Sequence, residues 1–160
     1  EEKLQSVFKL FGELSNAHQL AAAIVQARTK PITTTTELKE AIKSCLPSNY
    51  ENKILAQIFQ AIRIEINDEM GALQAMLKQC ADVLKPGGRL VIISYHSLED
   101  RLVKNYMKSG NMEGILEKDF YGNIISPLKS ITRKPITPGA TELTSNPRSR
   151  SAKLRIAQKI

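Results

Sequence analysis

Residues 85–94 constrain the fold of this chain more than any other segment. Lys85-Pro86-Gly87-Gly88-Arg89 cannot continue a helix, because proline lacks an amide hydrogen and the two glycines permit positive φ in a tight turn. The apolar and largely β-branched run Leu90-Val91-Ile92-Ile93-Ser94 follows directly. A nearly continuous apolar run is typical of a strand in a parallel sheet that is covered on both faces. The segment therefore predicts a helix, a tight turn and a buried strand.

The residues before this turn predict helices, and no strand pattern occurs before residue 88. Apolar residues at helical spacing predict two short helices within the first 25 residues. Thr34 followed by Glu37 has the pattern of a capping box, which predicts a third helix that ends before Pro47. The apolar pattern over about 52–84 predicts one long helix, or two helices with a break near Gly71.

The residues after the strand predict one more helix and two more strands. Ser97 followed by Asp100 has the pattern of a second capping box, so a helix is expected to begin there. A turn is predicted at 121–123, with strands over about 130–136 and 152–157 that pair antiparallel. Because a strand followed by a helix is half of a doubly wound unit, the sequence predicts a helix-rich α/β protein.

The positive charge of the chain is concentrated in its C-terminal third. The net charge is +7 at pH 7, with −1 over residues 1–100 and +8 over residues 101–160. Such an asymmetry is expected of a surface that faces a polyanion, and a solvated face of a basic protein is the alternative. Glu142 is the only acidic residue over residues 129–160. The basic residues of the same segment are Lys129, Arg133, Lys134, Arg148, Arg150, Lys153, Arg155 and Lys159.

Several protein classes are excluded by the composition. Uninterrupted apolar runs such as Leu90–Ile93 are far shorter than a bilayer span. Cys45 and Cys80 lie in separate apolar patterns without metal-ligand spacing, which predicts core residues in a reducing compartment, with no disulfide and no metal site. No leader pattern precedes the first helix, so a cytoplasmic protein is expected. The sequence begins at Glu1 inside a periodic segment, as a piece of a longer protein would.

His96 is the strongest candidate for a functional side chain. It lies where the buried strand passes into the next helix, and ligands of open α/β sheets bind at the carboxyl ends of the strands. Ser97 and Asp100 are explained as a cap, and Arg101 as a surface partner of a neighbouring carboxylate. His96 precedes the predicted cap and is expected to project into the crevice.

Two further groups of polar residues are candidates for the same site. The segment 146–151 combines a proline turn with Arg148 and Arg150, and guanidinium groups hold phosphate through forked hydrogen bonds. A basic surface turn is the alternative for this segment. Asn67 and Asp68 lie near Arg63 in an apolar helical pattern, and either line the crevice or mark the solvent side.

Four segments carry a family resemblance through their combined order and spacing. They are Lys30-Pro31-Ile32-Thr33-Thr34-Thr35, Arg63-Ile64-Glu65-Ile66-Asn67-Asp68-Glu69, the run 85–101 with Ser94-Tyr95-His96-Ser97-Leu98-Glu99-Asp100-Arg101 at its end, and Asn146-Pro147-Arg148-Ser149-Arg150-Ser151-Ala152-Lys153-Leu154-Arg155. Together they closely resemble the bacterial small-subunit ribosomal RNA (cytosine-N4) methyltransferase family, over nearly the whole chain. Tyr95 stands where the family usually has Phe, and Met70 where Leu is common.

The resemblance implies an incomplete class I methyltransferase. The expected architecture is an all-helical insertion domain over residues 1–62, which recognises substrate, followed by the C-terminal part of a Rossmann-like sheet over residues 63–160. The glycine-rich loop, the acidic residue and the Ser-Pro segment with which the family binds S-adenosylmethionine have no match here, and no G-x-G occurs. The resemblance implies that full-length members of the family use S-adenosylmethionine. This chain, in contrast, is expected to hold no cofactor-binding residue, to bind the cofactor weakly and to be inactive alone.

The activity that the resemblance implies is methylation of the exocyclic N4 amine of a cytidine in small-subunit ribosomal RNA. The amine attacks the methyl group in line, so no covalent enzyme intermediate is needed. Methylation at carbon five uses a cysteine that typically follows proline, whereas Cys45 follows Ser44 and Cys80 follows Gln79. By resemblance, the target nucleotide faces His96, Ser97, Glu99 and Asn67. The expected RNA-binding residues are Arg148, Arg150, Ser151, Lys153, Arg155, Arg133 and Lys134.

The expected partners are small-subunit ribosomal RNA or a ribosomal particle, without a membrane. In a class I sheet the strand at residues 89–94 lies between two others, and only the one at 152–157 is present here. The free edge predicts a homo-oligomer or another covering chain. Two other functions remain open: a noncatalytic RNA- or ribosome-binding module, and a small-molecule methyltransferase, which the basic C-terminal third disfavours.

Overall fold

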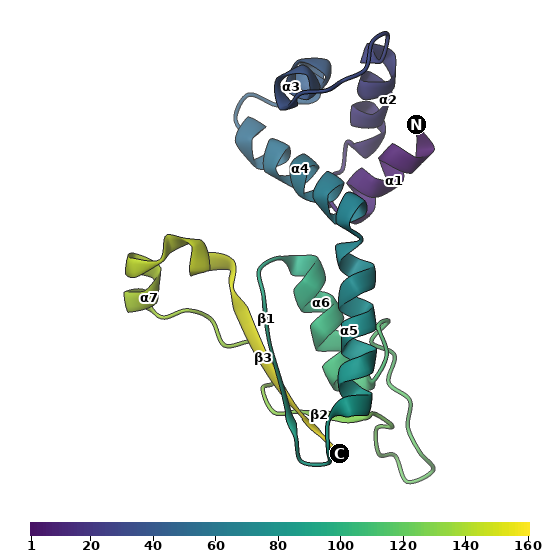
Figure 1. Ribbon diagram of the computed structural model, residues 1–160, viewed down its shortest axis with the longest axis vertical. Coiled ribbons are helices and arrows are strands. Elements are labelled where there is room, and N and C mark those ends of the chain that lie inside the picture. The colour runs from purple at the N-terminus through teal and green to yellow at the C-terminus, as the bar shows by residue number, and fades with distance from the viewer. The chain divides into compact units, whose positions relative to one another are not determined.

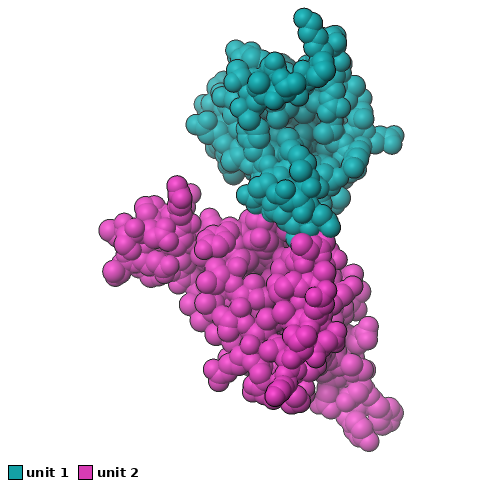
Figure 2. Space-filling view, viewed as in Figure 1, with its two compact units in different colours: residues 1–69 teal, residues 70–160 magenta.

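The helices predicted before residue 84 are all present in the computed structural model, which describes all 160 residues. The chain forms two units, residues 1–69 and residues 70–160 (Figure 2). The sequence sets its domain boundary at 62/63, inside a helix that continues to Asn67. No helix has both the length and the apolar character needed to span a bilayer.

Unit 1 is built from four helices and a short 3-10 turn (Figure 1). Their apolar faces form one core, in which Phe8, Leu20, Ile42 and Ile58 are fully buried. Burial of this apolar stripe is the main force that stabilises helices of this length. The elements are α1 (Glu2–Leu10), α2 (Ala17–Ala27), α3 (Thr35–Ile42), η1 (Lys43–Cys45) and α4 (Glu51–Asn67).

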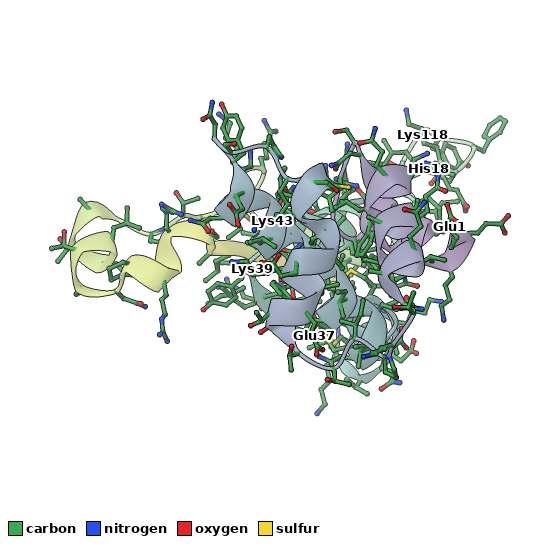
Figure 3. All side chains as sticks on the ribbon, turned by 90° about the horizontal axis from the view of Figure 1, so that it is seen from above. Glu1, His18, Glu37, Lys39, Lys43 and Lys118 are labelled. Carbon is green, nitrogen blue, oxygen red and sulfur yellow. The ribbon has the colours of Figure 1, made fainter.

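The predicted capping box of α3 is confirmed. The Thr34 hydroxyl accepts the Glu37 amide at 3.1 Å, and Glu37 Oε2 accepts the Thr34 amide at 2.9 Å. Hydrogen bonds from the backbone amides of Thr33 and Thr34 lower the pKa of Glu37. Elsewhere on the surface of unit 1, His18 Nε2 lies 3.7 Å from Glu1 Oε1 (Figure 3), a surface pair of the kind that contributes little stability.

The break in the long helical pattern lies at Asp68 and not near Gly71, which corrects the prediction. Asp68 has φ 48° and ψ 44°, and its amide donates to the Ile64 carbonyl. Aspartate adopts this left-handed conformation more readily than most residues, so the helix ends without a glycine. Gly71 lies inside the next helix, α5 (Glu69–Val83).

Unit 2 contains the predicted turn and strand. The Gly88 amide donates to the Lys85 carbonyl at 2.9 Å, and Gly87 has φ 82°, a conformation that favours glycine. The strand β1 (Arg89–Ser94) follows, as predicted. The remaining elements are α6 (Ser97–Ser109), β2 (Leu128–Ser130), α7 (Ala140–Ser145), η2 (Pro147–Ser151) and β3 (Lys153–Lys159).

The three strands form an antiparallel sheet in the order β1-β3-β2 (Figure 1). Arg89 pairs with Gln158 and Ser94 with Lys153 at the two ends of the β1–β3 ladder. Leu77 of α5, Val103 of α6 and Ala157 of β3 belong to one buried cluster, so both helices pack on the same face. The antiparallel pairing of the last two strands is confirmed.

Two predictions about these strands need correction. The strand at 89–94 has no parallel partner and is covered on one face only, so Val91 and Ile93 remain 53% and 52% exposed. The strand predicted at 130–136 is confined to β2 and one bridge between Ile136 and Leu154. The Ile131 and Thr132 amides both donate to the Ile156 carbonyl, at 2.9 and 3.3 Å, so two residues face one and the regular ladder is interrupted there.

Candidate functional site

His96 is the N-cap of α6, at the carboxyl end of β1. Its Nδ1 accepts the Glu99 amide at 3.4 Å, and Glu99 Oε2 accepts the Tyr95 and His96 amides at 2.9 and 3.4 Å. The capping box therefore uses His96 and Glu99, and its predicted placement at Ser97 and Asp100 is wrong by one residue. Ser97 is the first residue of α6 and lies at the surface.

The second ring nitrogen of His96 is the one buried side-chain polar atom without a hydrogen-bond partner. The His96 side chain is only 11% exposed, and its Nε2 lies 3.4 Å from Glu99 Oε1 without hydrogen-bond geometry. Because Nδ1 accepts a hydrogen bond, a neutral imidazole here carries its hydrogen on Nε2. The arrangement holds a donor nitrogen and a carboxylate oxygen side by side at the end of the strand.

Asp100 serves β3 instead of the helix cap. It accepts from Arg155 Nε at 2.6 Å, from Arg155 Nη2 at 3.1 Å and from Lys153 Nζ at 3.3 Å. Burial by itself raises the pKa of Asp100, but the hydrogen bonds and charges of Arg155 and Lys153 outweigh it and lower the pKa below its ordinary value. Arg155 is only 7% exposed, so its guanidinium is committed to this ion pair.

The two other predicted arginines lie on the 3-10 turn η2. Arg148 and Arg150 are both exposed, and neither forms an ion pair. Between them Ser149 is buried, and its hydroxyl donates to the Asn146 carbonyl at 2.8 Å. The predicted Ser151 ends this turn and is also exposed. The buried serine fixes the turn, and the guanidinium groups point to solvent on either side of it in the sequence.

Arg133 and the neighbouring Lys134 are also exposed, and Arg133 lines a pocket of about 490 Å³. Sequence analysis missed Lys104 and Lys108, which line the same pocket from α6. The signal was present, because two lysines four residues apart lie on one face of a helix. The complete lining is Lys104, Met107, Lys108, Ser130, Thr132, Arg133 and Arg155.

Asn67 belongs to unit 1, whereas the other predicted site residues belong to unit 2. Its side-chain amide donates to Glu69 Oε1 at 3.2 Å. Arg63 holds the same carboxylate in a fork, with Nε 2.7 Å from Oε1 and Nη2 3.1 Å from Oε2. Glu69, the first residue of α5, is thus bound to two residues of α4 on the other side of the left-handed Asp68.

The residues of this chain do not fit a cofactor cradle. The glycine pair Gly87-Gly88 lies at the amino end of β1, whereas a nucleotide-type cradle needs small residues at the carboxyl end. At that end the chain has Tyr95 and His96, whose amides are already satisfied by Glu99. No group of three or more His, Cys, Asp or Glu side chains that could hold a metal ion occurs in the structure.

Comparison with known proteins identifies the group to which this chain is related. A relative from Phocaeicola vulgatus is 56% identical over 160 residues, and one from Parabacteroides distasonis is 55% identical over 160. Each alignment covers 99% of this chain, and 53% and 52% of the respective relative. A relative from Flavobacterium johnsoniae is 56% identical over 161 residues, covering 100% of this chain and 53% of its own length.

All three relatives carry the name ribosomal RNA small subunit methyltransferase H. This chain spans about half the length of these curated relatives. The family model described as the MraW methylase family matches residues 1–160, the whole chain. The resemblance drawn from the sequence is confirmed: the chain belongs to the MraW methylase family.

Proposed function

We propose that this chain forms the RNA-facing part of an enzyme that methylates the N4 amine of a cytidine in small-subunit ribosomal RNA. The observation that carries the proposal is the unpartnered His96 Nε2 beside Glu99 Oε1 at the carboxyl end of β1. Membership of the MraW methylase family over the whole chain and the names of the relatives support the same reaction class.

The two side chains suit the polar edge of cytosine. That edge has hydrogen-bond acceptors at O2 and N3 and a donor at the N4 amine. A donor that faces N3 and a neighbouring acceptor that faces the N4 amine therefore match it. His96 Nε2 supplies the donor, and Glu99 Oε1 accepts no backbone hydrogen bond and is available as the acceptor. In this proposal Glu99 orients the amine, and Ser97 at the start of α6 contacts the rest of the nucleotide.

In this proposal the methyl donor is held by residues other than these. S-adenosylmethionine is the donor implied by the family, and this chain lacks a cradle for it. The proposal therefore assigns nucleotide recognition to this chain and does not assign binding of the donor to it. Calorimetry of the 160-residue chain with S-adenosylmethionine is expected to show no tight binding, and tight binding would contradict this division.

The exposed cations of unit 2 are proposed to hold the RNA backbone. Arg148, Arg150 and Ser151 on η2 carry free polar groups, and forked guanidinium groups match phosphate oxygens. The exposed Arg133 and Lys134 extend this basic surface, and so does the half-buried Lys153, whose Nζ also lies 3.3 Å from Asp100 Oδ2. We assign Arg155 a positioning role, because its buried ion pair with Asp100 holds β3 against α6. A ribosomal RNA substrate places the reaction in the cytoplasm.

The reaction is tested with the native polypeptide that contains these residues, small-subunit ribosomal RNA and S-adenosylmethionine with a labelled methyl group. Digestion to nucleosides is expected to place the label in N4-methylcytidine. Label on carbon five of cytosine would contradict the proposed chemistry. Tight RNA binding without any transfer would favour the noncatalytic RNA-binding module.

The RNA surface is tested separately by replacing Arg148 and Arg150 together with alanine. Each lost phosphate contact removes about 0.7 from the slope of log affinity against log salt for single-stranded RNA, so the slope should flatten by about 1.4. Fluorescence anisotropy over a salt series measures it. An unchanged slope would exclude these two residues from the RNA interface.

A further inference from the structure

The pocket beside α6 lies outside the His96 site and is lined by none of the residues of its capping box. Lys104, Met107 and Lys108 line it from α6, Ser130 from β2, and Arg155 from β3. Thr132 and Arg133 complete it from the segment after β2. Its volume of about 490 Å³ is within the range of pockets that hold small organic groups.

The pocket carries three positive charges that nothing in the structure neutralises. Lys104, Lys108 and Arg133 form no ion pair with a carboxylate, unlike Arg155, which is paired with Asp100. Two lysines four residues apart on a helix repel each other, so the pair destabilises α6 unless an anion lies between them. Three uncompensated cations around one concave surface are a site for a polyvalent anion.

The pocket also contains two hydroxyl groups, of which one has its hydrogen available to a ligand. The Ser130 hydroxyl is already used, because it donates to the Met107 carbonyl at 3.0 Å. The Thr132 hydroxyl accepts the Ile156 amide at 3.1 Å, so its own hydrogen is available to a ligand. A hydroxyl donor among two ammonium groups and a planar guanidinium fits tetrahedral phosphate oxygens.

We propose that this pocket binds one phosphodiester group of the RNA strand, through Lys104, Lys108, Arg133 and the Thr132 hydroxyl. The inference rests on the proposed RNA substrate and adds a contact to it. The strand is favoured over free phosphate because Arg133 is followed by the exposed Lys134, so the positive surface continues beyond the pocket. The volume leaves room for the sugar attached to the phosphate.

The test replaces Lys104 and Lys108 with glutamine in the native polypeptide and measures binding of a single-stranded RNA by fluorescence anisotropy. At 0.1 M salt each lost contact is expected to weaken binding about fivefold, and the double variant should lower the salt slope by about 1.4. The matched control is Lys78→Gln with Lys85→Gln, which removes the same charge from exposed positions outside the pocket. It should change the slope by less than half as much.

A second arm separates the strand from free phosphate. Inorganic phosphate is titrated into the same proteins, and amide shifts of Thr132 and Arg133 are followed by NMR. Weaker RNA binding with a lower slope than the control supports the proposal. Equal effects of the two double variants on RNA binding overturn it, and so does phosphate binding in the pocket without any change in RNA binding. A native protein that binds no RNA would also contradict the proposed function. The two outcomes that overturn only the pocket proposal do not contradict that function.

Discussion

At the scale of single residues, Asp100 joins helix α6 to strand β3. Its carboxylate is in contact with the buried Arg155 guanidinium through two hydrogen bonds of 2.6 and 3.1 Å. A buried cation that loses its partner keeps its desolvation cost, so removing one member of such a pair is more harmful than replacing both. Asp100 is therefore a structural residue in a segment that otherwise carries functional candidates.

Asp100→Asn is expected to lower the free energy of unfolding by about 3 kcal/mol, because it leaves the Arg155 charge buried without a counter-charge. Urea denaturation followed by circular dichroism measures the change. Asp82→Asn is the control, since Asp82 is exposed in α5 and forms no ion pair, and it should be close to neutral. Equal stability of the two variants would contradict the structural role of Asp100.

The same ion pair predicts a pH dependence. The pKa of Asp100 is lowered in the folded state, so its stabilising contribution is complete above the ordinary aspartate pKa and is lost as the pH falls through the lower, folded value. The difference in stability between the native protein and Asp100→Asn should therefore be constant near pH 7. It should shrink below about pH 4. A difference that stays constant down to pH 2 would argue against the lowered pKa.

At the scale of elements, His96 has two roles that substitutions can separate. Asparagine is one of the best N-cap residues, whereas alanine cannot cap. His96→Asn is expected to keep the stability of α6 but to lose methyl transfer, because the Nε2 donor is gone. His96→Ala should lose transfer and also about 1 kcal/mol of stability. Denaturation and the nucleoside assay measure the two effects, and full activity in His96→Asn would leave His96 as a cap only.

Gly110 ends α6 in a left-handed conformation, with φ 74°. A Cβ at this position would lie 2.7 Å from Pro127 Cδ, so Gly110→Ala combines backbone strain with a clash. It is expected to destabilise the protein by more than about 1 kcal/mol. Gly139→Ala is the control, because Gly139 has φ −77° and no atom within 4 Å of an added Cβ, and the weaker N-cap of the six-residue α7 should cost less than about 1 kcal/mol. A thermal denaturation series compares them, and equal melting temperatures would contradict the prediction.

The elements that could be predicted from the sequence are those that local chemistry decides. The capping box at Thr34 and Glu37 lies within four residues, and the turn before β1 follows from Pro86 and two glycines. The cap of α6 was placed one residue too late because Asp100 has a stronger partner in Arg155, which is 55 residues away. A local sequence pattern cannot show that Asp100 binds a residue so far along the chain instead of capping the helix.

The candidate site was predicted in part for the same reason. His96 follows from its place after an apolar strand, but its unpartnered nitrogen depends on how the ring turns to meet the Glu99 amide. Arg155 has the same residue type as Arg148 and Arg150, and only the fold shows that it is buried. Residue type and spacing predict which cations are present, and tertiary packing decides which of them face solvent.

At the scale of the whole molecule, β1 is an edge strand of the three-stranded sheet. It pairs only with β3, and its outward face exposes Val91 and Ile93. An apolar edge strand of this kind readily pairs with another chain. We propose that in the 160-residue chain a second copy covers this strand, which gives a homo-oligomer.

Val91→Lys is expected to shift that assembly toward the monomer, because a charged side chain on an edge strand opposes pairing. Light scattering of the 160-residue chain over a concentration series measures the mass. Ile125→Lys is the control, since Ile125 is 56% exposed in a loop outside the sheet, and it should leave the mass unchanged. A native chain that remains a monomer throughout the series would contradict the proposed oligomer.

Nucleoside mass spectrometry of small-subunit ribosomal RNA gives the most direct test of the proposed activity. The RNA is taken from cells that have or lack the gene encoding this chain. Loss of the gene is predicted to abolish one N4-methylated cytidine, and the native gene should restore it, whereas the His96→Asn gene should not. An N4-methylated cytidine signal that is unchanged when the gene is absent would contradict the account.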